Sequence, residues 1–571
     1  MPIPRWLPHI LFPQKKFLCY TAFLQEDKNI FSSAKIRYAL IAVIGFLLYA
    51  KTLFYGFTYL DDNVWLQDYG WLLKHASNAA ALFTNPDLVS GVFYRPLLSL
   101  SFMMDAQWAG DQLLPYHLTN ILIHILNSCL VFHLFKKLGY DERMAFVFAL
   151  IFTVHPALTQ AVVWIPGRTD SFLALWILLS FLFFINFLNH RKWPDYFFHV
   201  LFWIAALLVK ETAIALPVLC ALYWFLIFRG HKDQRKLALF FFVWGLLAAA
   251  LFIVRKQILP ESALITKDAA VATMVENIPS FISYLGKIIF PFNLSVLPIN
   301  ADTRLIGGWL ALAALSLSLS VSRAKRMNYI FFGIMWFVVF LTPSLLLSFI
   351  NHEYRLYLPI LGILIVLLEA DVFKRALASR NLKWIFVALI ACLAVKNLVY
   401  SGEFKNRWAF WNNAVKNSPH SPLAHRNLGA MMHLSGQLEK AEAHYKEALK
   451  LNPQEKMVHN NLGLIHVNRG EFVEAEREYK QEIMMNPAYD NVYYNLGVLY
   501  LQTGRPEEAE ASWKAVVKIN PNFVDVYAPL ALLYIHQKRY TEADASVKEL
   551  QKRGVVAPAG LSEILLRQGF H

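Results

Sequence analysis

The sequence has 571 residues, of which 57% are hydrophobic, 15% aromatic and only 16% charged. Soluble proteins average about 25% charged residues, so this composition excludes a wholly soluble chain and predicts extensive contact with lipid. The formal net charge is +14. Lys and Arg nevertheless lie mainly in short connectors between apolar runs, where they orient membrane spans, so we expect no binding to nucleic acid. The four cysteines have neither the spacing of a zinc site nor that of a disulfide framework.

Residues 1–35 contain charged and aromatic residues but no apolar core followed by a small-residue cleavage site. We therefore interpret them as a retained cytoplasmic tail. Between residues 36 and 401, apolar stretches near the length of about 20 residues that crosses a bilayer recur. They predict a transmembrane domain over 36–401 with eleven spans, at 36–56, 117–135, 144–164, 171–189, 196–210, 212–228, 237–254, 305–321, 328–349, 355–371 and 384–401.

The distribution of basic residues gives an independent test of this span count, because cytoplasmic loops hold an excess of Lys and Arg. With the N-terminus inside, every second connector is basic, whereas the first outer loop, 57–116, has six Asp and only Lys74 and Arg95 as basic residues. The segment 279–299 is apolar but is interrupted by Lys287 and Pro291. We predict that it is an outer or re-entrant element and not a full span.

After a linker at 402–417, an internal repeat of 34 residues begins. Asn427, Asn461 and Asn495 each open an Asn-Leu-Gly sequence at this spacing. This period and pattern are typical of tetratricopeptide repeats (TPRs), which are pairs of helices. We predict a TPR domain over 418–571, with four repeats, the last one degenerate, and a capping helix at 560–569. The three Asn residues have packing as their default role, and contact with a bound peptide in the TPR groove is the alternative.

The odd number of spans places the repeats on the outer side, where polar residues also cluster at the span ends. Charges near a membrane are costly unless they are paired or hydrated, so such clusters are candidates for function. The candidate residues fall in six short segments: Asp61 and Asp62; Tyr94 and Arg95; His117; His155, Arg168 and Asp170; Lys210 and Glu211; and His352, Glu353 and Arg355.

A pair of carboxylates beside several cations suits the displacement of a phosphate leaving group by a hydroxyl. Asp61 or Asp62 can accept the proton of the nucleophile as a general base. Arg95, Arg168 and Arg355, together with Lys210, His117 and His155, are the candidates for binding phosphate, because cationic and hydrogen-bonding groups stabilise the departing charge. Tyr94, Asp170, Glu211, His352 and Glu353 are assigned supporting or acceptor-binding roles. The alternative is structural: solvated loop residues, local ion pairs or interfacial side chains.

These residues, in this order, resemble the transmembrane and tetratricopeptide-repeat O-mannosyltransferases, which are membrane glycosyltransferases of the GT-C class. The likeness includes the Asp61-Asp62 pair, Tyr94-Arg95-Pro96, Lys210-Glu211, and Glu353 with Arg355, followed by the repeats. It departs from animal members at Gln160, where they have an acidic residue, and in its short repeat array. The short repeat array, together with the brief loops, favours a bacterial homologue, in the inner membrane with a periplasmic TPR domain.

The resemblance implies an all-α fold, a polyprenyl-phosphate sugar donor, inversion at the anomeric carbon, and a protein or glycan hydroxyl acceptor. It also assigns the essential acidic pair of the family to Asp61 and Asp62. Paired carboxylates suit Mg²⁺ or Mn²⁺, but only two adjacent acids are evident, so the metal stays open and no cofactor is assigned. Two other functions stay open: a membrane-anchored TPR scaffold, and a ligase for lipid-linked oligosaccharides.

Overall fold

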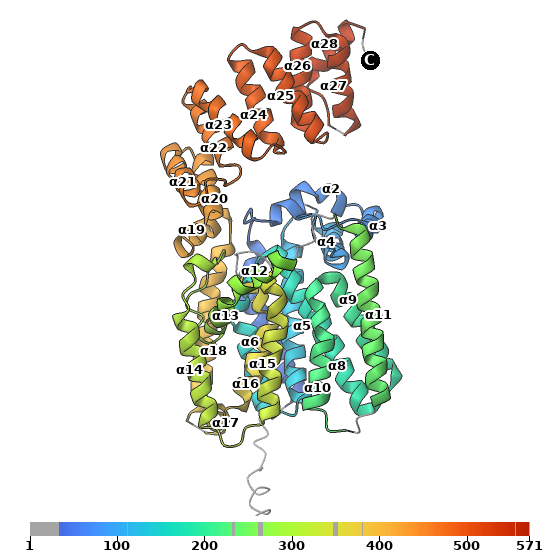
Figure 1. Cartoon of the computed structure of the whole chain (residues 1–571), viewed down its shortest axis with the longest axis vertical. Coiled ribbons are helices and arrows are strands. Elements are labelled where there is room, and N and C mark those ends of the chain that lie inside the picture. The colour runs from blue at the N-terminus through green and yellow to red at the C-terminus, as the bar shows by residue number, and fades with distance from the viewer. Residues whose placement is uncertain are drawn as a thin grey trace, which may run out of the picture.

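The computed structural model describes residues 33–569, with gaps at 111, 231–233, 261–266, 347–351, 380 and 554. The predicted tail at 1–35 lies almost wholly outside the described residues. All regular elements in the described part are helices, which confirms the predicted all-α class. Figure 1 shows an upright helical bundle with an arched stack of helix pairs above it.

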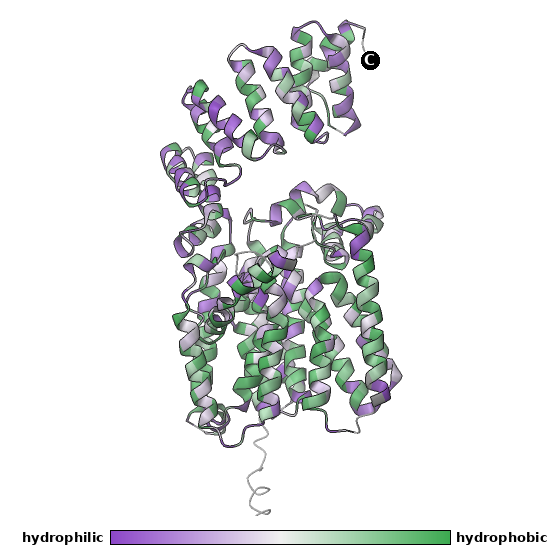
Figure 2. Cartoon of the chain, viewed as in Figure 1, coloured by the Kyte–Doolittle hydropathy of each residue, from purple (hydrophilic) through white to green (hydrophobic). Residues whose placement is uncertain are grey.

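The bundle consists of apolar helices that run between its two ends, and Figure 2 shows their hydrophobic surfaces. Within the described residues, six helical stretches are long and apolar enough to cross a membrane: Ala34–Phe54 (α1 with η2), Leu114–Lys137 (α5), Ile165–His190 (mainly α8), Ala238–Ile258 (in α11), Met327–Leu346 (α15 with η10) and Lys383–Phe404 (mainly α18). Four shorter apolar helical stretches are Trp193–Val209 (α9), Glu211–Leu226 (η7 with α10), Ile306–Ser320 (α14) and Pro359–Glu369 (α16).

The predicted span 144–164 is a broken helix. Its two parts, Glu142–Val154 (α6) and Pro156–Val163 (η5 with α7, Thr159–Val163), are bent by 51°. The break lies at His155 and Pro156, because proline lacks an N–H donor and its ring disfavours helical backbone at the preceding residue. Each of the eleven predicted spans overlaps a helix in its described residues, whereas the number that crosses a membrane stays a prediction.

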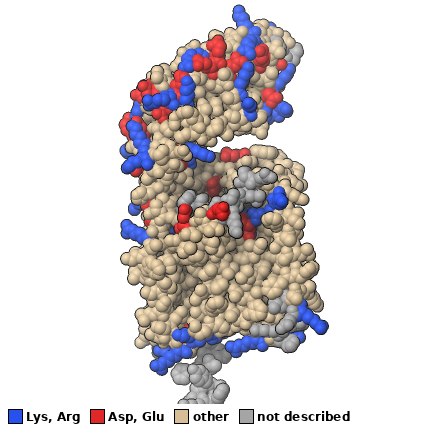
Figure 3. All heavy atoms as spheres, in the orientation of Figure 1, with Lys and Arg blue, Asp and Glu red and all other residues tan. Residues whose placement is uncertain are grey.

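Short helices cover the bundle at the end that faces the repeats (Figure 1). The predicted outer loop 57–116 is largely helical there, with η3 (Val64–Asp68), α2 (Gly70–Leu73), α3 (Ala79–Thr84) and α4 (Pro96–Ala109). Two further helices, α12 (Lys267–Asn277) and α13 (Pro279–Ile289), lie at the same end. Lys and Arg gather at the opposite end of the bundle, near α17 (Asp371–Ala378), as Figure 3 shows. This asymmetry supports the expected orientation but depends on the positive-inside rule alone.

The chain after α19 (Arg407–Asn417) forms four helix pairs and a final helix. The pairs are α20 and α21 (Pro422–Leu434, Leu438–Leu451), α22 and α23 (Val458–Asn468, Phe472–Met485), α24 and α25 (Asp490–Gln502, Pro506–Ile519), and α26 and α27 (Tyr527–His536, Tyr540–Lys552); α28 (Ala559–Arg567) follows.

The turn inside each pair needs a left-handed backbone conformation. The first three repeats place Gly436, Gly470 and Gly504 there, with φ of +76°, +76° and +74°. The fourth repeat has Lys538 at the same position, with φ of +60°. Because a Cβ makes this conformation unfavourable, the fourth turn is strained relative to the other three.

The stack is attached to the bundle by buried polar contacts near α19. The Ser418 hydroxyl donates to the Leu297 carbonyl at 2.7 Å, and the Asn413 side-chain oxygen accepts from the Val296 N–H at 3.2 Å. Apolar residues of α20, including Leu428 and Met431, belong to the same hydrophobic core as the bundle. These contacts hold the repeats above the end of the bundle that carries the polar clusters.

Candidate active site

Five of the predicted site residues, Asp61, Arg95, Lys210, His352 and Arg355, meet in one cavity of about 290 Å³ at the end of the bundle facing the repeats. They come from four separate segments of the chain, because His352 and Arg355 share one segment. Other residues that line the cavity include Trp65, Asp87, Ser90, Trp164, Thr169 and Tyr354. A second cavity of about 340 Å³ shares Asp87 and Arg95 with it. The two cavities therefore lie side by side.

The site residues occupy breaks between helices, which explains how the sequence places them there. Arg95 immediately precedes Pro96, the first residue of α4, and has an extended φ of −137°. Lys210 is likewise extended, between α9 and η7. Arg355 lies in η11 (Glu353–Leu356), four residues before Pro359, which begins α16. Proline favours the first turn of a helix and restricts the residue before it, so the sequence fixes the start of α4 after Arg95 and the start of α16 after η11.

The two adjacent acidic residues have different environments. The Asp62 carboxylate is buried and accepts four hydrogen bonds: from the Thr58 N–H and hydroxyl, at 2.6 and 2.9 Å, and from the N–H groups of Tyr59 and Asn63, at 2.9 and 3.0 Å. Asp62 therefore closes the turn after the first span. Asp61 lines the cavity, and its carboxylate has no hydrogen-bond donor among the described residues.

Asp61 also has the electrostatics of a base. Burial raises its pKa to about 6, and the neighbouring charges of Asp62 and Asp87 add to this effect. A carboxylate with a raised pKa is a better proton acceptor than one in water and is still ionised at neutral pH.

The cations of the cavity are neutralised to different degrees. The Arg95 guanidinium makes a bidentate pair with Glu211, at 2.6 and 3.2 Å, and the Lys210 ammonium lies 2.7 Å from the Asp170 carboxylate. Arg355 is 8% exposed, and its guanidinium donates weakly to the Ser344 carbonyl at 3.4 Å. No carboxylate pairs with Arg355 in the part of the chain that the structure describes, so its charge is the least compensated.

Aromatic rings form one wall of the cavity. The rings of His352, Trp164 and Tyr354 form a cluster in which each contacts the other two, with centroids 6.2 Å (Trp164–His352), 4.8 Å (His352–Tyr354) and 5.8 Å (Trp164–Tyr354) apart. Burial and the nearby charges of Arg355, Lys210 and Lys287 hold the pKa of His352 well below its usual range, so the imidazole is neutral. The Trp164 indole N–H is buried and unpaired among the described residues. This wall offers the flat faces of aromatic rings to the cavity.

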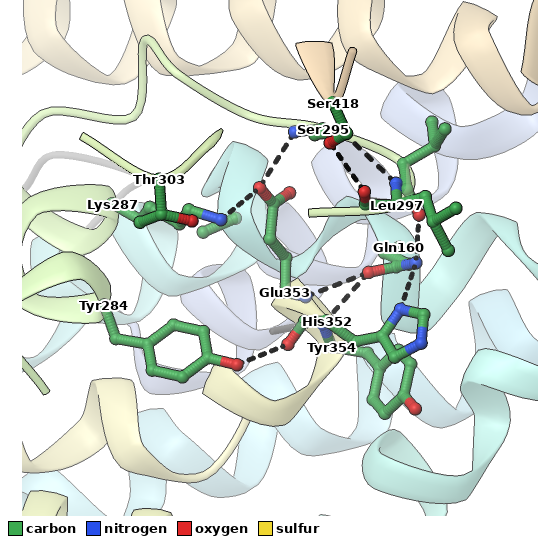
Figure 4. Close-up of polar contacts among 12 residues, drawn as sticks. Gln160, Tyr284, Lys287, Ser295, Leu297, Thr303, His352, Glu353, Tyr354 and Ser418 are labelled. Carbon is green, nitrogen blue, oxygen red and sulfur yellow. Dashed lines mark hydrogen bonds and ion pairs between the residues drawn. The ribbon is translucent and has the colours of Figure 1, made fainter. Parts of the chain in front are cut away.

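Glu353 does not line the cavity; it holds the segment that does. As Figure 4 shows, its buried carboxylate accepts from Lys287 and from the Ser295 N–H, each at 3.0 Å. The side-chain oxygen of Gln160 accepts from the Glu353 N–H at 3.0 Å, while its amide donates to the Val296 carbonyl at 3.1 Å. An acidic residue at position 160 could not make the second bond when ionised. Gln160 and Glu353 thus fix η11 and the position of Arg355.

Four other predicted site residues lie outside the cavity. Arg168 is fully buried, with Asp105 and Asn120 at 2.5 and 2.6 Å. The side chains of His117 and His155 are buried against the carbonyls of Tyr55 and Ile288, at 3.3 and 2.9 Å. Tyr94 is also buried, and its hydroxyl donates to a carbonyl of α3 at 3.1 Å. In this structure all four have packing partners instead of access to the cavity.

Sequence reasoning missed Asp87, Trp164, Thr169 and Tyr354 among the residues that line the cavity. Tyr354 lies between Glu353 and Arg355, which were both predicted, and only this position in the sequence could have indicated that Tyr354 lines the cavity. Asp87 was one of six Asp in the outer loop, without a feature to distinguish it.

The three predicted Asn residues of the repeats make local contacts. The Asn427 amide donates to the Leu423 carbonyl at 3.1 Å, and the Asn495 amide donates to the Asn460 side chain at 2.9 Å. Asn461 is partly buried and accepts from the Asn460 amide at 3.3 Å.

Comparisons with known proteins agree with this architecture. Residues 98–256 match the family described as Dolichyl-phosphate-mannose-protein mannosyltransferase, and residues 431–470 and 491–523 match tetratricopeptide-repeat families. Protein O-mannosyl-transferase Tmtc1 of Drosophila melanogaster is 32% identical over 202 residues, which are 34% of this chain and 23% of that protein. A protein O-mannosyl-transferase of Caenorhabditis elegans is 24% identical over 368 residues, 60% of this chain and 51% of that protein.

The chain is similar to these O-mannosyltransferases over the matched segments. The resemblance seen in the ordered motifs is thereby confirmed, although the matches span only 23% and 51% of the two relatives. Among solved structures, that of MamA is similar with 21% identity and a TM-score of 0.24, covering 28% of this chain and 93% of that one.

Proposed function

We propose that this chain is a membrane glycosyltransferase that moves a sugar from a polyprenyl-phosphate donor to a hydroxyl of a protein or glycan. The observation that carries the proposal is the cavity in which an unpaired carboxylate, Asp61, and a poorly compensated guanidinium, Arg355, lie together. The similarity to protein O-mannosyl-transferases supports the same reaction class. A scaffold protein or a purely structural role would not require an unpaired carboxylate and a poorly compensated guanidinium in the same water-accessible cavity.

In the proposed reaction, the oxygen of the acceptor hydroxyl attacks the anomeric carbon as the bond from that carbon to the phosphate oxygen breaks. Asp61 accepts the hydroxyl proton, and polyprenyl phosphate leaves with the electron pair. Arg355 binds the phosphate first, with Arg95 and Lys210 near it, because fixed cations stabilise charge that grows on the leaving group. Displacement from the opposite face inverts the anomeric carbon.

Supporting roles follow from the contacts. Glu211 and Asp170 orient Arg95 and Lys210 by the pairs described above, and the ring cluster of Trp164, His352 and Tyr354 offers a surface for the sugar ring. Asp62 shapes the loop that carries Asp61 and takes no proton. The domain limits, the eleven spans and the periplasmic position of the repeats in a bacterial inner membrane belong to the same proposal. The TPR domain would hold the acceptor above the cavity.

Metal dependence is part of the test. In the described part of the chain, no three His, Cys, Asp or Glu side chains converge as metal ligands. Purified protein in nanodiscs should transfer label from one member of a panel of polyprenyl-phosphate sugars to an acceptor peptide, with and without EDTA. Asp61→Asn should lose transfer by about 10³-fold or more, as general-base loss does.

Two variants make this test specific. Asp68→Asn removes an exposed carboxylate from the same loop and should transfer like the wild type. Asp62→Asn should lose thermal stability along with transfer, because the amide nitrogen that replaces one carboxylate oxygen cannot accept two of the four hydrogen bonds. Equal turnover in wild type and Asp61→Asn would refute the base, and no transfer from any donor would favour a scaffold.

A further inference from the structure

A third cavity, of about 620 Å³, opens at the end of the bundle opposite the repeats. Four basic residues line it, and each stands where a membrane helix begins or ends: Lys137 at the end of α5, Arg191 after α8, Arg229 after α10 and Arg326 before α15. No Asp or Glu of the described residues lines it. It is far along the bundle from the cavity with Asp61 and shares no residue with it.

Internal partners compensate only part of this charge. Arg326 pairs with the buried Glu369 at 2.6 Å and stacks on Tyr329, 3.6 Å from the ring centroid. The Lys137 ammonium donates to the neutral Asn186 side chain at 2.9 Å. Arg191 and Arg229 are exposed and have no acidic partner among the residues described.

Helix ends explain the presence of basic residues but not their convergence. A cation near a helix C-terminus gains about 0.3–1 kcal/mol from the helix dipole, which would apply to Lys137, Arg191 and Arg229. A cation at a helix end gains no stability from lying in the same cavity as other cations, since like charges repel. An anion in the hollow removes this repulsion.

The lining also indicates which anion fits. Beside the basic groups the cavity presents apolar and aromatic side chains, namely Leu188, Tyr223, Ile227, Phe228 and Tyr329. A free phosphate ion would leave these surfaces unused, whereas a phospholipid has a phosphate next to an apolar glycerol and acyl region. Basic pockets between membrane helices at a membrane surface are suited to such head groups. Figure 3 shows that Lys and Arg surround this end of the bundle.

We propose that this cavity binds the head group of an anionic phospholipid, with the phosphate between Arg191 and Arg229 and the aromatic side chains beneath it. The inference does not depend on the proposed transferase activity. The bound lipid would hold the ends of α5, α8, α10 and α15 together at the end of the bundle away from the repeats.

The test measures binding of fluorescent phosphatidylglycerol and phosphatidylcholine to the purified full-length protein. The wild type should prefer phosphatidylglycerol. Arg191→Gln with Arg229→Gln should weaken phosphatidylglycerol binding by about tenfold or more, because each basic residue near an anionic lipid surface contributes about fivefold. Both residues are exposed, so we expect the variant to fold normally, as gel filtration and thermal unfolding would verify.

The control variant, Arg143→Gln with Lys383→Gln, removes the same charge from exposed positions at the starts of α6 and α18, outside the cavity. It should bind like the wild type. Equal weakening in both variants would mean that only the general charge of this end matters, and would overturn the site. Displacement of the lipid by inorganic phosphate at micromolar concentration would also overturn it, in favour of a soluble anion.

Discussion

Replacing Asp61 by Asn should stabilise the protein while abolishing transfer. Burial and the charges of Asp62 and Asp87 raise the Asp61 pKa from 3.8 to about 6. Each pKa unit corresponds to about 1.4 kcal/mol, so ionised Asp61 costs the fold at most about 3 kcal/mol, and about 1–2 kcal/mol is expected for this partly solvated group. Asn has nearly the same shape and no charge, so it removes that cost. The expected variant is therefore inactive and more stable at pH 7.5.

The pH dependence makes this prediction sharper. A carboxyl group whose folded pKa lies above its unfolded pKa binds protons more tightly in the folded state, so its ionisation removes stability as pH rises from about 4 to about 6. The difference in thermal midpoint between Asp61→Asn and the wild type should be near zero at pH 4 and complete above pH 7. Thermal unfolding of both proteins in nanodiscs from pH 4 to 8 measures it. A variant that is less stable than the wild type at pH 7.5 would refute the reasoning.

Four other predictions follow from the same contacts. The transfer rate of the wild type should rise with pH through about 6 as Asp61 ionises, and a flat profile from pH 5 to 8 would exclude Asp61 as the base. Arg355→Gln should lower kcat/KM for the donor by about 10²–10³-fold, as loss of one charged donor to a transition state does, with little change in the thermal midpoint. Arg168→Ala should destabilise the protein by about 3–5 kcal/mol because it leaves Asp105 buried and unpaired; thermal unfolding would measure this, and an inactive but equally stable variant would instead indicate a role in the site. Lys538→Gly should slow hydrogen exchange in α26 and α27 of the full chain by up to about tenfold, since it removes about 1 kcal/mol of left-handed strain; faster exchange would contradict the account of the fourth turn.

Much of the architecture could be predicted because it depends on periodic signals. Apolar stretches predicted the helices of the bundle, and the 34-residue spacing of Asn427, Asn461 and Asn495 predicted the repeats. The alternation of basic connectors predicted that Asp61, Arg95 and Arg355 lie at one end of the bundle, where the cavity brings them together. These signals are short sequence patterns, or follow from the number of spans and the spacing of the repeats, so a single sequence is enough to find them.

Which residues of the site carry the chemistry and which support the structure could not be predicted in the same way. Asp61 and Asp62 are identical in type and adjacent, and only the turn at Thr58 and Tyr59 distinguishes them. Gln160 fixes Glu353 across 193 residues of sequence, a contact that no local pattern reveals. Arg168 resembled a phosphate ligand by its position near a span end, but its pairing with Asp105 depends on how α4 packs on the bundle.

The most direct test of the account asks whether the base and the phosphate ligand are separate groups in one cavity. Equilibrium binding of a polyprenyl phosphate, the proposed leaving group, would be measured for the wild type, Asp61→Asn, Arg355→Gln and Arg304→Gln, the last removing an exposed arginine outside the cavity. Asp61→Asn and Arg304→Gln should bind at least as tightly as the wild type, and Arg355→Gln should bind about tenfold or more weakly, as loss of a charged hydrogen bond to phosphate predicts. Unchanged binding in Arg355→Gln would contradict the assignment of this cavity to the donor phosphate.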